Sequence, residues 1–394
     1  MDIEKSKELL IKICEIGKQH HQIPDLFDLF PFSHYFDNEN KLKKEEIEKI
    51  DGLWTRREIL TRYLLVSSVL DQGPDLEGVR ELLKKVVNSL YENEIRILHK
   101  PLDFFKELNI SIDEILKKHE CIKKVRAELW ARENKTTPNK YNLFTDRTKQ
   151  VLGYAVYRWG VPLSLFHLLE KDLLKNGRYS NEPLVEYIES WDSAEIMSQQ
   201  IKDNERYGLG KAIGDKAGHL FAKLYIHTFG INKRKDNGFG PLSYELPFDS
   251  NAGRVLFRTG FLLNFAKLEE YEKWGVIQKE KGKGGKDYIR VTNIRGKSCE
   301  KLNKCEEFMK LYNEAIINYL KVRKRQAKII EIQRIPNALL LETKYGIGHL
   351  DDGLIYIGIN FCYNHENPKC NECPINEFCL AYKEKKDLIC NYRT

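Results

Sequence analysis

Four cysteines near the end of the sequence have the type and spacing that most directly suggest chemistry. Cys362, Cys370, Cys373 and Cys379 fall within eighteen residues, separated by seven, two and five residues, and Pro374 follows the third directly. Thiolates bind both zinc and iron–sulfur clusters. Structural zinc sites usually use two separated close pairs of ligands, whereas this segment has one CxxC and two outlying cysteines. The spacing therefore favours a cubane iron–sulfur cluster, with zinc or ordinary cysteines as the alternatives.

A second stretch, Tyr207–Lys223, places glycines between two segments of helical pattern. A glycine-containing turn before a helix exposes backbone N–H groups at the positive end of that helix, which suits an anion such as a DNA phosphate. An ordinary tight turn between two helices would have the same pattern.

A third stretch, Phe239–Arg254, is a Gly/Pro-rich loop that delivers one acid, Asp249, to the start of a helix. A carboxylate in that position is often only an N-cap. A short helix within His349–Cys362 then leads into the first cysteine of the cluster segment.

These stretches are set in a chain with helical spacing over most of its length. Residues 55–70 are apolar on more than one face, which predicts a buried central helix. Residues 95–203 continue with apolar residues at intervals of three and four. Strand signals are almost confined to a basic β-hairpin at about 274–294, where a Gly/Lys turn joins two short runs.

The composition is that of a soluble globular protein. The chain has 394 residues, 42% hydrophobic and 31% charged, with nine cysteines and a formal net charge of +7. We find no apolar run long enough to span a membrane, and the first helix carries acids that a secretory signal lacks. A cytoplasmic protein with reduced thiols is the simplest interpretation.

Basic residues gather in the C-terminal half of the sequence. Lys279–Lys301 holds eight Lys/Arg and three acids, and Lys321–Arg334 holds six Lys/Arg and one acid. Asn232–Asp236 adds a shorter basic run. Such segments suit nucleic-acid binding, but a solvated lysine-rich surface would have the same composition.

The cysteine run, the glycine turn and the loop-borne Asp, in this order along the chain, resemble the helix-hairpin-helix/Gly-Pro-Asp superfamily of DNA glycosylases. The resemblance is closest to the endonuclease III branch, whose members carry a 4Fe–4S cluster. It covers roughly residues 60–90, 205–260 and 345–380, about a third of the chain. Large insertions at about 95–195 and 265–335 and an N-terminal extension mark a divergent member.

The resemblance implies a mainly α fold of two helical subdomains with a DNA-binding cleft between them. One would be a discontinuous domain, 1–60 with 231–394, carrying the iron–sulfur loop 362–379 and the inserted hairpin. The other would be a barrel-like domain, 61–230, ending in the helix-hairpin-helix motif at about 195–226.

The resemblance also assigns roles to single residues. Lys216 falls where bifunctional members keep a lysine nucleophile, and Asp249 matches the family aspartate. Gln72 lies where members insert a side chain into the gap left by a flipped base. The remaining expected DNA contacts are Ala212 and Gly214 of the hairpin, in which Ala212 replaces the first glycine, together with Asn251 and Arg254.

From the activity of this family, the resemblance implies that the protein is a base-excision repair enzyme that binds double-stranded DNA. It would flip a damaged or modified base, cleave the N-glycosidic bond and cut the strand through a lysine Schiff base. The cysteines would hold a structural 4Fe–4S cluster, and a monomer is expected, associated with the nucleoid if the source is a prokaryote. The alternatives are a monofunctional glycosylase, a sequence-specific base-excising defence enzyme, and a non-enzymatic iron–sulfur DNA-binding protein.

Overall fold

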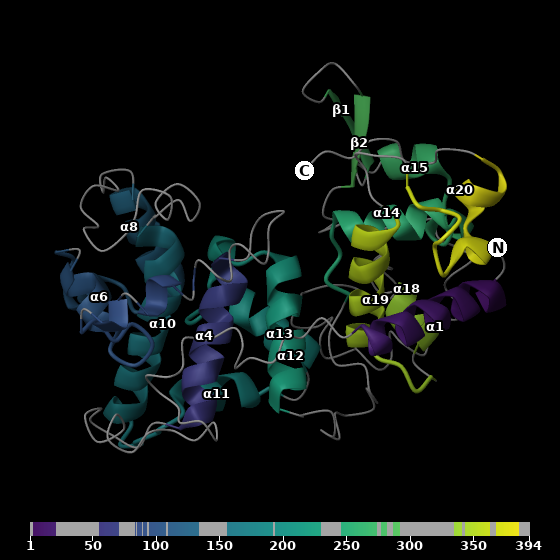
Figure 1. Ribbon diagram of the computed structural model, residues 1–394. Helices are drawn as coiled ribbons and strands as arrows, with labels where there is room; N and C mark the ends of the chain where they lie inside the picture. Colours follow the sequence, from purple (N-terminus) through teal and green to yellow (C-terminus); the bar gives the residue numbers. More distant parts are fainter. Residues whose placement is uncertain are drawn as a thin grey trace. The chain divides into compact units, whose positions relative to one another are not determined.

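The protein is mainly helical, as its sequence predicts (Figure 1). The computed structural model describes residues 3–20, 55–70, 83, 85–88, 90–92, 94–107, 109–133, 156–191, 194–229, 246–273, 277–281, 287–291, 335–340, 343–362 and 368–385. Within these residues, no helix is both long enough and apolar enough to cross a membrane.

The chain divides into two units. The first combines Met1–Gln22 with Asn232–Thr394, and the second is the continuous segment Ile23–Ile231. The predicted boundary after residue 60 would cut through a single helix, Arg56–Leu70, which belongs whole to the second unit.

The second unit, in its described residues, is an assembly of helices with one 3₁₀ turn. Its described elements are α4 (Arg56–Leu70), α6 (Pro101–Glu107), α7 (Ile112–Lys118), α8 (Ile122–Glu133), α10 (Val156–Lys175), α11 (Pro183–Glu189), α12 (Ala194–Asp203), η3 (Gly210–Ala212) and α13 (Asp215–Phe229).

Helix α4 is the buried centre of this unit. It packs against α10, α11 and α13, and Figure 1 shows it between α10 and α13. Its apolar residues are all at most 3% exposed, namely Ile59, Leu60, Tyr63, Leu64, Leu65, Val66, Val69 and Leu70. Helices that are apolar on more than one face are buried on more than one face, so the predicted central helix is confirmed.

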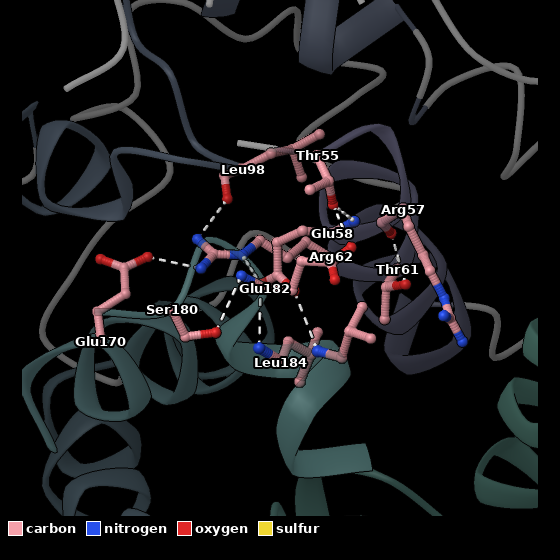
Figure 2. Close-up of polar contacts among 11 residues, drawn as sticks. Thr55, Arg57, Glu58, Thr61, Arg62, Leu98, Glu170, Ser180, Glu182 and Leu184 are labelled. Carbon is pink, nitrogen blue, oxygen red and sulfur yellow. Dashed lines mark hydrogen bonds and ion pairs between the residues drawn. The ribbon is translucent and has the colours of Figure 1, made fainter. Parts of the chain in front are cut away.

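Two charged residues of α4 are also buried, and they bind to each other and to three other segments (Figure 2). The Glu58 carboxylate accepts from Arg62 Nε at 2.7 Å and from the backbone N–H groups of Leu184 and Val185, each at 3.0 Å. Those two N–H groups lie in the first turn of α11, where helix donors have no partner within the helix. Glu58 therefore satisfies the start of α11 from a neighbouring helix.

The Arg62 guanidinium completes this buried network. Its Nη1 donates to the Leu98 carbonyl at 2.8 Å, and its Nη2 donates to the Glu170 carboxylate at 2.6 Å. Burial raises the pKa of Glu58, and Arg62 and the two backbone donors oppose that shift. Burial and then the Arg62 charge lower the pKa of His99 to about 3, so this imidazole is neutral. The network joins α4, α10, α11 and the turn before α6.

The first unit is built around a helix close to the cysteine segment. Its described elements are α1 (Ile3–Gln19), α14 (Ser250–Arg258), η4 (Leu262–Asn264), α15 (Leu268–Lys273), β1 (Ile277–Lys281), β2 (Asp287–Val291), α18 (Ile335–Leu340), α19 (Ile347–Asn360), η7 (Asn376–Phe378) and α20 (Leu380–Lys383). Helix α19 packs against α1, α14 and α18.

Glycines let α19 approach its neighbours at backbone distance. A Cβ atom at Gly353 would lie 2.1 Å from the carbonyl oxygen of Ile13, and one at Gly17 would lie 1.9 Å from that of His349. No real Cβ fits in either place, so α1 and α19 cross only because both positions lack a side chain. Further along α19, a Cβ at Gly358 would lie 3.0 Å from the Cβ of Asn251 on α14.

The two strands form an antiparallel hairpin, in which Ile277 pairs with Val291 and Lys281 with Asp287. This pairing falls within the predicted segment of about 274–294. The hairpin packs onto the helices through α14 and α15. Its turn and most of the basic segments noted above lie outside the described residues.

Candidate functional site

The four clustered cysteines line one cavity of about 200 Å³ in the first unit. Cys362 follows α19 closely, and Cys379 is the N-cap of α20. Cys370 and Cys373 lie on the loop between them. Segments that precede and follow this loop therefore bring all four cysteines to one space, as the spacing in the sequence predicts.

Consecutive turns give the loop its shape. The N–H of Cys373 donates to the Cys370 carbonyl at 3.3 Å, that of Asn376 to the Cys373 carbonyl at 3.1 Å, and that of Cys379 to the Asn376 carbonyl at 3.0 Å. Each turn reverses the chain within three residues, and the residues at the turn ends, Cys370, Cys373, Asn376 and Cys379, all line the cavity. The longer first gap contains residues 363–367, which lie outside the described residues.

Burial disfavours the charged form of two of the cavity thiols. Burial raises the pKa of Cys373 to about 12 and also raises the pKa of Cys379. Thiolates at these positions therefore need a positive charge close by, such as a metal centre. In the described part of the chain, no three His, Cys, Asp or Glu residues converge tightly enough for one metal ion.

One arginine directly faces the cysteine sulfurs. Arg258, at the end of α14, donates from Nη1 to Cys362 Sγ at 3.4 Å and is 7% exposed. Its own carbonyl accepts from the Cys379 thiol at 3.5 Å. Sequence reasoning did not select Arg258. Its spacing of four residues from Arg254, which puts both on one face of a helix, is the signal that was present.

The Arg254 side chain binds backbone carbonyls of the segment that ends at Cys362. Its Nη2 donates to the Gly358 carbonyl at 2.9 Å and to Asn251 Oδ1 at 2.6 Å, and its Nε donates to the Cys362 carbonyl. The residue is 3% exposed. Arg254, expected as a DNA contact, is therefore buried and binds the chain that leads into the first cysteine.

Asp249 begins the helix that carries both arginines. As the N-cap of α14, it accepts through Oδ1 from the N–H groups of Asn251 at 2.9 Å and Ala252 at 3.0 Å. The capping task weighed from the sequence is thus present. Through Asn251 and Arg254, a chain of hydrogen bonds runs from the Asp249 carboxylate to the carbonyl of Cys362.

The glycine turn lies in the second unit, between α12 and α13, which pack against each other. Ala212 is 3% exposed and its N–H donates to the Leu209 carbonyl at 3.1 Å, so it faces the protein interior. Gly214 is exposed, and Lys216 lies half-buried in the first turn of α13. Of the two hairpin positions expected at DNA, only Gly214 is at the surface.

The predicted site residues thus fall into two groups. Asp249, Asn251, Arg254 and the four cysteines form one connected set in the first unit. Gly214 and Lys216 belong to the second unit. Gln72 lies outside the described residues.

The exposed charges around the cysteine loop are balanced. Within residues 368–385 the exposed cations and anions are Lys369, Lys383, Lys385, Glu372, Glu377 and Glu384. Three positive and three negative side chains give this loop no net attraction for phosphate.

Comparison with known proteins adds no further identification, since no family model, no curated protein and no solved structure matches this chain.

Proposed function

We propose that this protein is a DNA glycosylase with associated strand-cleaving lyase activity, of the helix-hairpin-helix/Gly-Pro-Asp type. The observation that carries the proposal is the hydrogen-bonded path from Asp249 through Asn251 and Arg254 to Cys362. It ties an acid at a helix start to a cysteine-lined cavity, which are the two features that the resemblance requires of the first unit.

The cysteine cavity fits an iron–sulfur cluster by its donors and by its size. Four thiol donors surround a space instead of meeting at a point, which suits a multi-atom cluster. Cys362, Cys370, Cys373 and Cys379 would hold it, and it would supply a rigid core for the loop. Base release and strand cleavage transfer no electrons, so the cluster is assigned a structural task.

Arg254→Gln is expected to lower the amount of cluster that the purified protein retains. The substitution removes donors to the carbonyls of Cys362 and Gly358, and changes just outside a metal centre typically cost about 10- to 100-fold in metal affinity. The measurement is iron and acid-labile sulfide per chain, together with the visible absorbance of the protein.

Arg178→Gln is the matched control, because Arg178 is an arginine of the second unit with a 67% exposed side chain. Equal iron content in both variants would show that Arg254 does not help the protein to retain the cluster. Stoichiometric zinc in a colourless wild-type protein would replace the cluster by a zinc site.

The chemistry assigned to Asp249 and Lys216 follows from the bond to be broken. Cleavage of an N-glycosidic bond develops positive charge on the sugar, which a neighbouring carboxylate such as Asp249 stabilises. The Lys216 amine attacks the same sugar carbon while the base leaves with the bonding electrons and takes up a proton. The amine gives up a proton as its bond to the sugar carbon forms, and the ring C–O bond at that carbon then breaks to give the Schiff base. Elimination of the phosphate on the 3′ side cuts the strand.

Lys216→Ala is expected to abolish the covalent complex that borohydride traps on damaged or abasic duplex DNA. The variant lacks the only amine assigned to attack, so reduction finds no Schiff base. The measurement is a trapping assay on a panel of damaged bases, with Lys106→Ala as a control lysine of the same unit, 77% exposed. No trapping by the wild type would overturn the lyase, and base release retained in Lys216→Ala would make the enzyme monofunctional.

A further inference from the structure

A cluster of cations lies in the second unit, where α7 ends and α8 begins. Residues 117–126, which end α7 and begin α8, hold five Lys/Arg and one acid. This density matches that of the basic segments in the C-terminal half. Lys117, Lys118 and Lys124 are exposed, and Lys123 and Arg126 are half-buried. The segment belongs to the insertion at about 95–195, to which the resemblance assigns no task.

The start of α8 is bound to the loop between α12 and α13. The N–H of Ile122 donates to the Arg206 carbonyl at 2.7 Å, and Lys123 Nζ donates to the Asp203 carbonyl at 3.3 Å. Arg126 Nη1 donates to the Leu209 carbonyl at 3.3 Å. These bonds join two segments that are far apart in sequence and fix α8 to the hairpin.

The loop itself is shaped around Arg126. Gly210 has a φ of +59°, and a Cβ there would lie 1.7 Å from Arg126 Nη1. Glycine adopts this left-handed backbone without strain, and any other side chain here would displace the Arg126 guanidinium. The next residue, Lys211, is exposed, and Gly214 follows three residues later. Arg126 therefore holds α8 against the loop that carries Lys211 and leads into α13.

Several acids near this surface already have partners. Glu128 lies 3.7 Å from Lys118 Nζ and 2.9 Å from His119 Nε2. The Asp203 carboxylate accepts from the Gln199 side chain. Two exposed acids also lie close in sequence to the residues of this surface: Glu120 precedes α8, and Glu205 is in the loop between α12 and α13. The surface is therefore positive without being uniform.

We propose that Lys124 of α8 and Lys211 of the hairpin form a second contact surface for the phosphate backbone of DNA, continuous with the start of α13. This inference rests on the proposed function and assigns the insertion a part in it. Exposed lysines on two segments that are fixed to each other suit a polymer with repeated phosphates better than one small anion, because they come from separate segments of the surface. Lysines at such a surface contact backbone without reading sequence.

The test measures binding of lesion-free duplex DNA by fluorescence anisotropy over a series of salt concentrations. Relative to the wild type, Lys124→Ala/Lys211→Ala is expected to lower affinity about 10- to 100-fold near 0.1 M salt. It is also expected to reduce the slope of log affinity against log salt by about two, because two lysines no longer neutralise phosphates. Lys124→Arg/Lys211→Arg should restore both, and Lys106→Ala, which removes an exposed lysine of α6, should change neither.

Each outcome separates this surface from the proposed enzyme activity. Wild-type affinity and slope in the double alanine variant, together with base release by the wild type, would overturn the surface alone. Weakened binding in that variant, with no base release by the wild type on any lesion, would support the surface and overturn the glycosylase. Absence of wild-type binding to any DNA would overturn both.

Discussion

Asp249→Asn is expected to lower base release by about 10³-fold while duplex binding and folding stay close to those of the wild type. The substitution removes the charge that would stabilise the developing positive sugar. It keeps an oxygen able to accept from Asn251 and Ala252, because asparagine is as good an N-cap as aspartate. The measurement is single-turnover base release on the lesion that the wild type prefers, with affinity measured on the same duplex.

Asp249→Ala separates the two tasks of this side chain. It removes both the charge and the cap, so α14 should also be destabilised by about 0.5–2 kcal/mol. Ser111→Ala is the matched control, since Ser111 is the N-cap of α7 and accepts from the Glu114 N–H at 3.3 Å. Base release retained in Asp249→Asn would show that Asp249 is a cap alone and that its charge does not stabilise the transition state.

Arg62→Met is expected to lower the free energy of unfolding of the second unit by about 3–5 kcal/mol. Arg62 and Glu58 are both 0% exposed, and removing the guanidinium leaves the Glu58 carboxylate buried without its charged partner. The Leu98 carbonyl is also deprived of the Arg62 donor. Urea unfolding followed by tryptophan fluorescence measures the effect, because four of the five tryptophans lie in this unit.

Two further variants test whether the buried charge is responsible. Glu58→Gln/Arg62→Met removes both charges. Adding Glu58→Gln to Arg62→Met should therefore recover part of the stability that Arg62→Met alone removes. Arg178→Met breaks an ion pair with Glu186 at an exposed site and should cost less than about 1 kcal/mol. Equal destabilisation in Arg62→Met and Arg178→Met would mean that the network around Arg62 does not stabilise the unit.

The sequence predicts those features that depend on neighbouring residues. Residues 55–70 are apolar on several faces, which is sufficient to predict that α4 is buried. The runs on either side of a Gly/Lys turn predict the paired strands β1 and β2. The cysteines lie so close in sequence that few conformations could separate them, and all four line one cavity.

Features that depend on distant partners were not predictable in the same way. In the sequence, Arg62 is only one polar position on a helix. Its partners, the Leu98 carbonyl and the Glu170 carboxylate, lie 36 and 108 residues away. Arg254 has the spacing of a DNA contact, yet its partners at Gly358 and Cys362 follow from how α14 crosses α19. The hydrogen bond from Arg126 to the hairpin loop likewise depends on tertiary packing.

The glycine crossing of α1 and α19 also has a consequence for the order in which the chain folds during synthesis. Domains generally fold as units while the ribosome is still adding residues. The continuous segment Ile23–Ile231 is complete long before α19 emerges. Helix α1, which is made well before α19, must keep its apolar face away from other partners until Gly353 has been added and α19 can pack against it. Helix α1 therefore reaches its native place only after the much later α19 has been made, and chaperones have a long opportunity to bind α1 in the interval.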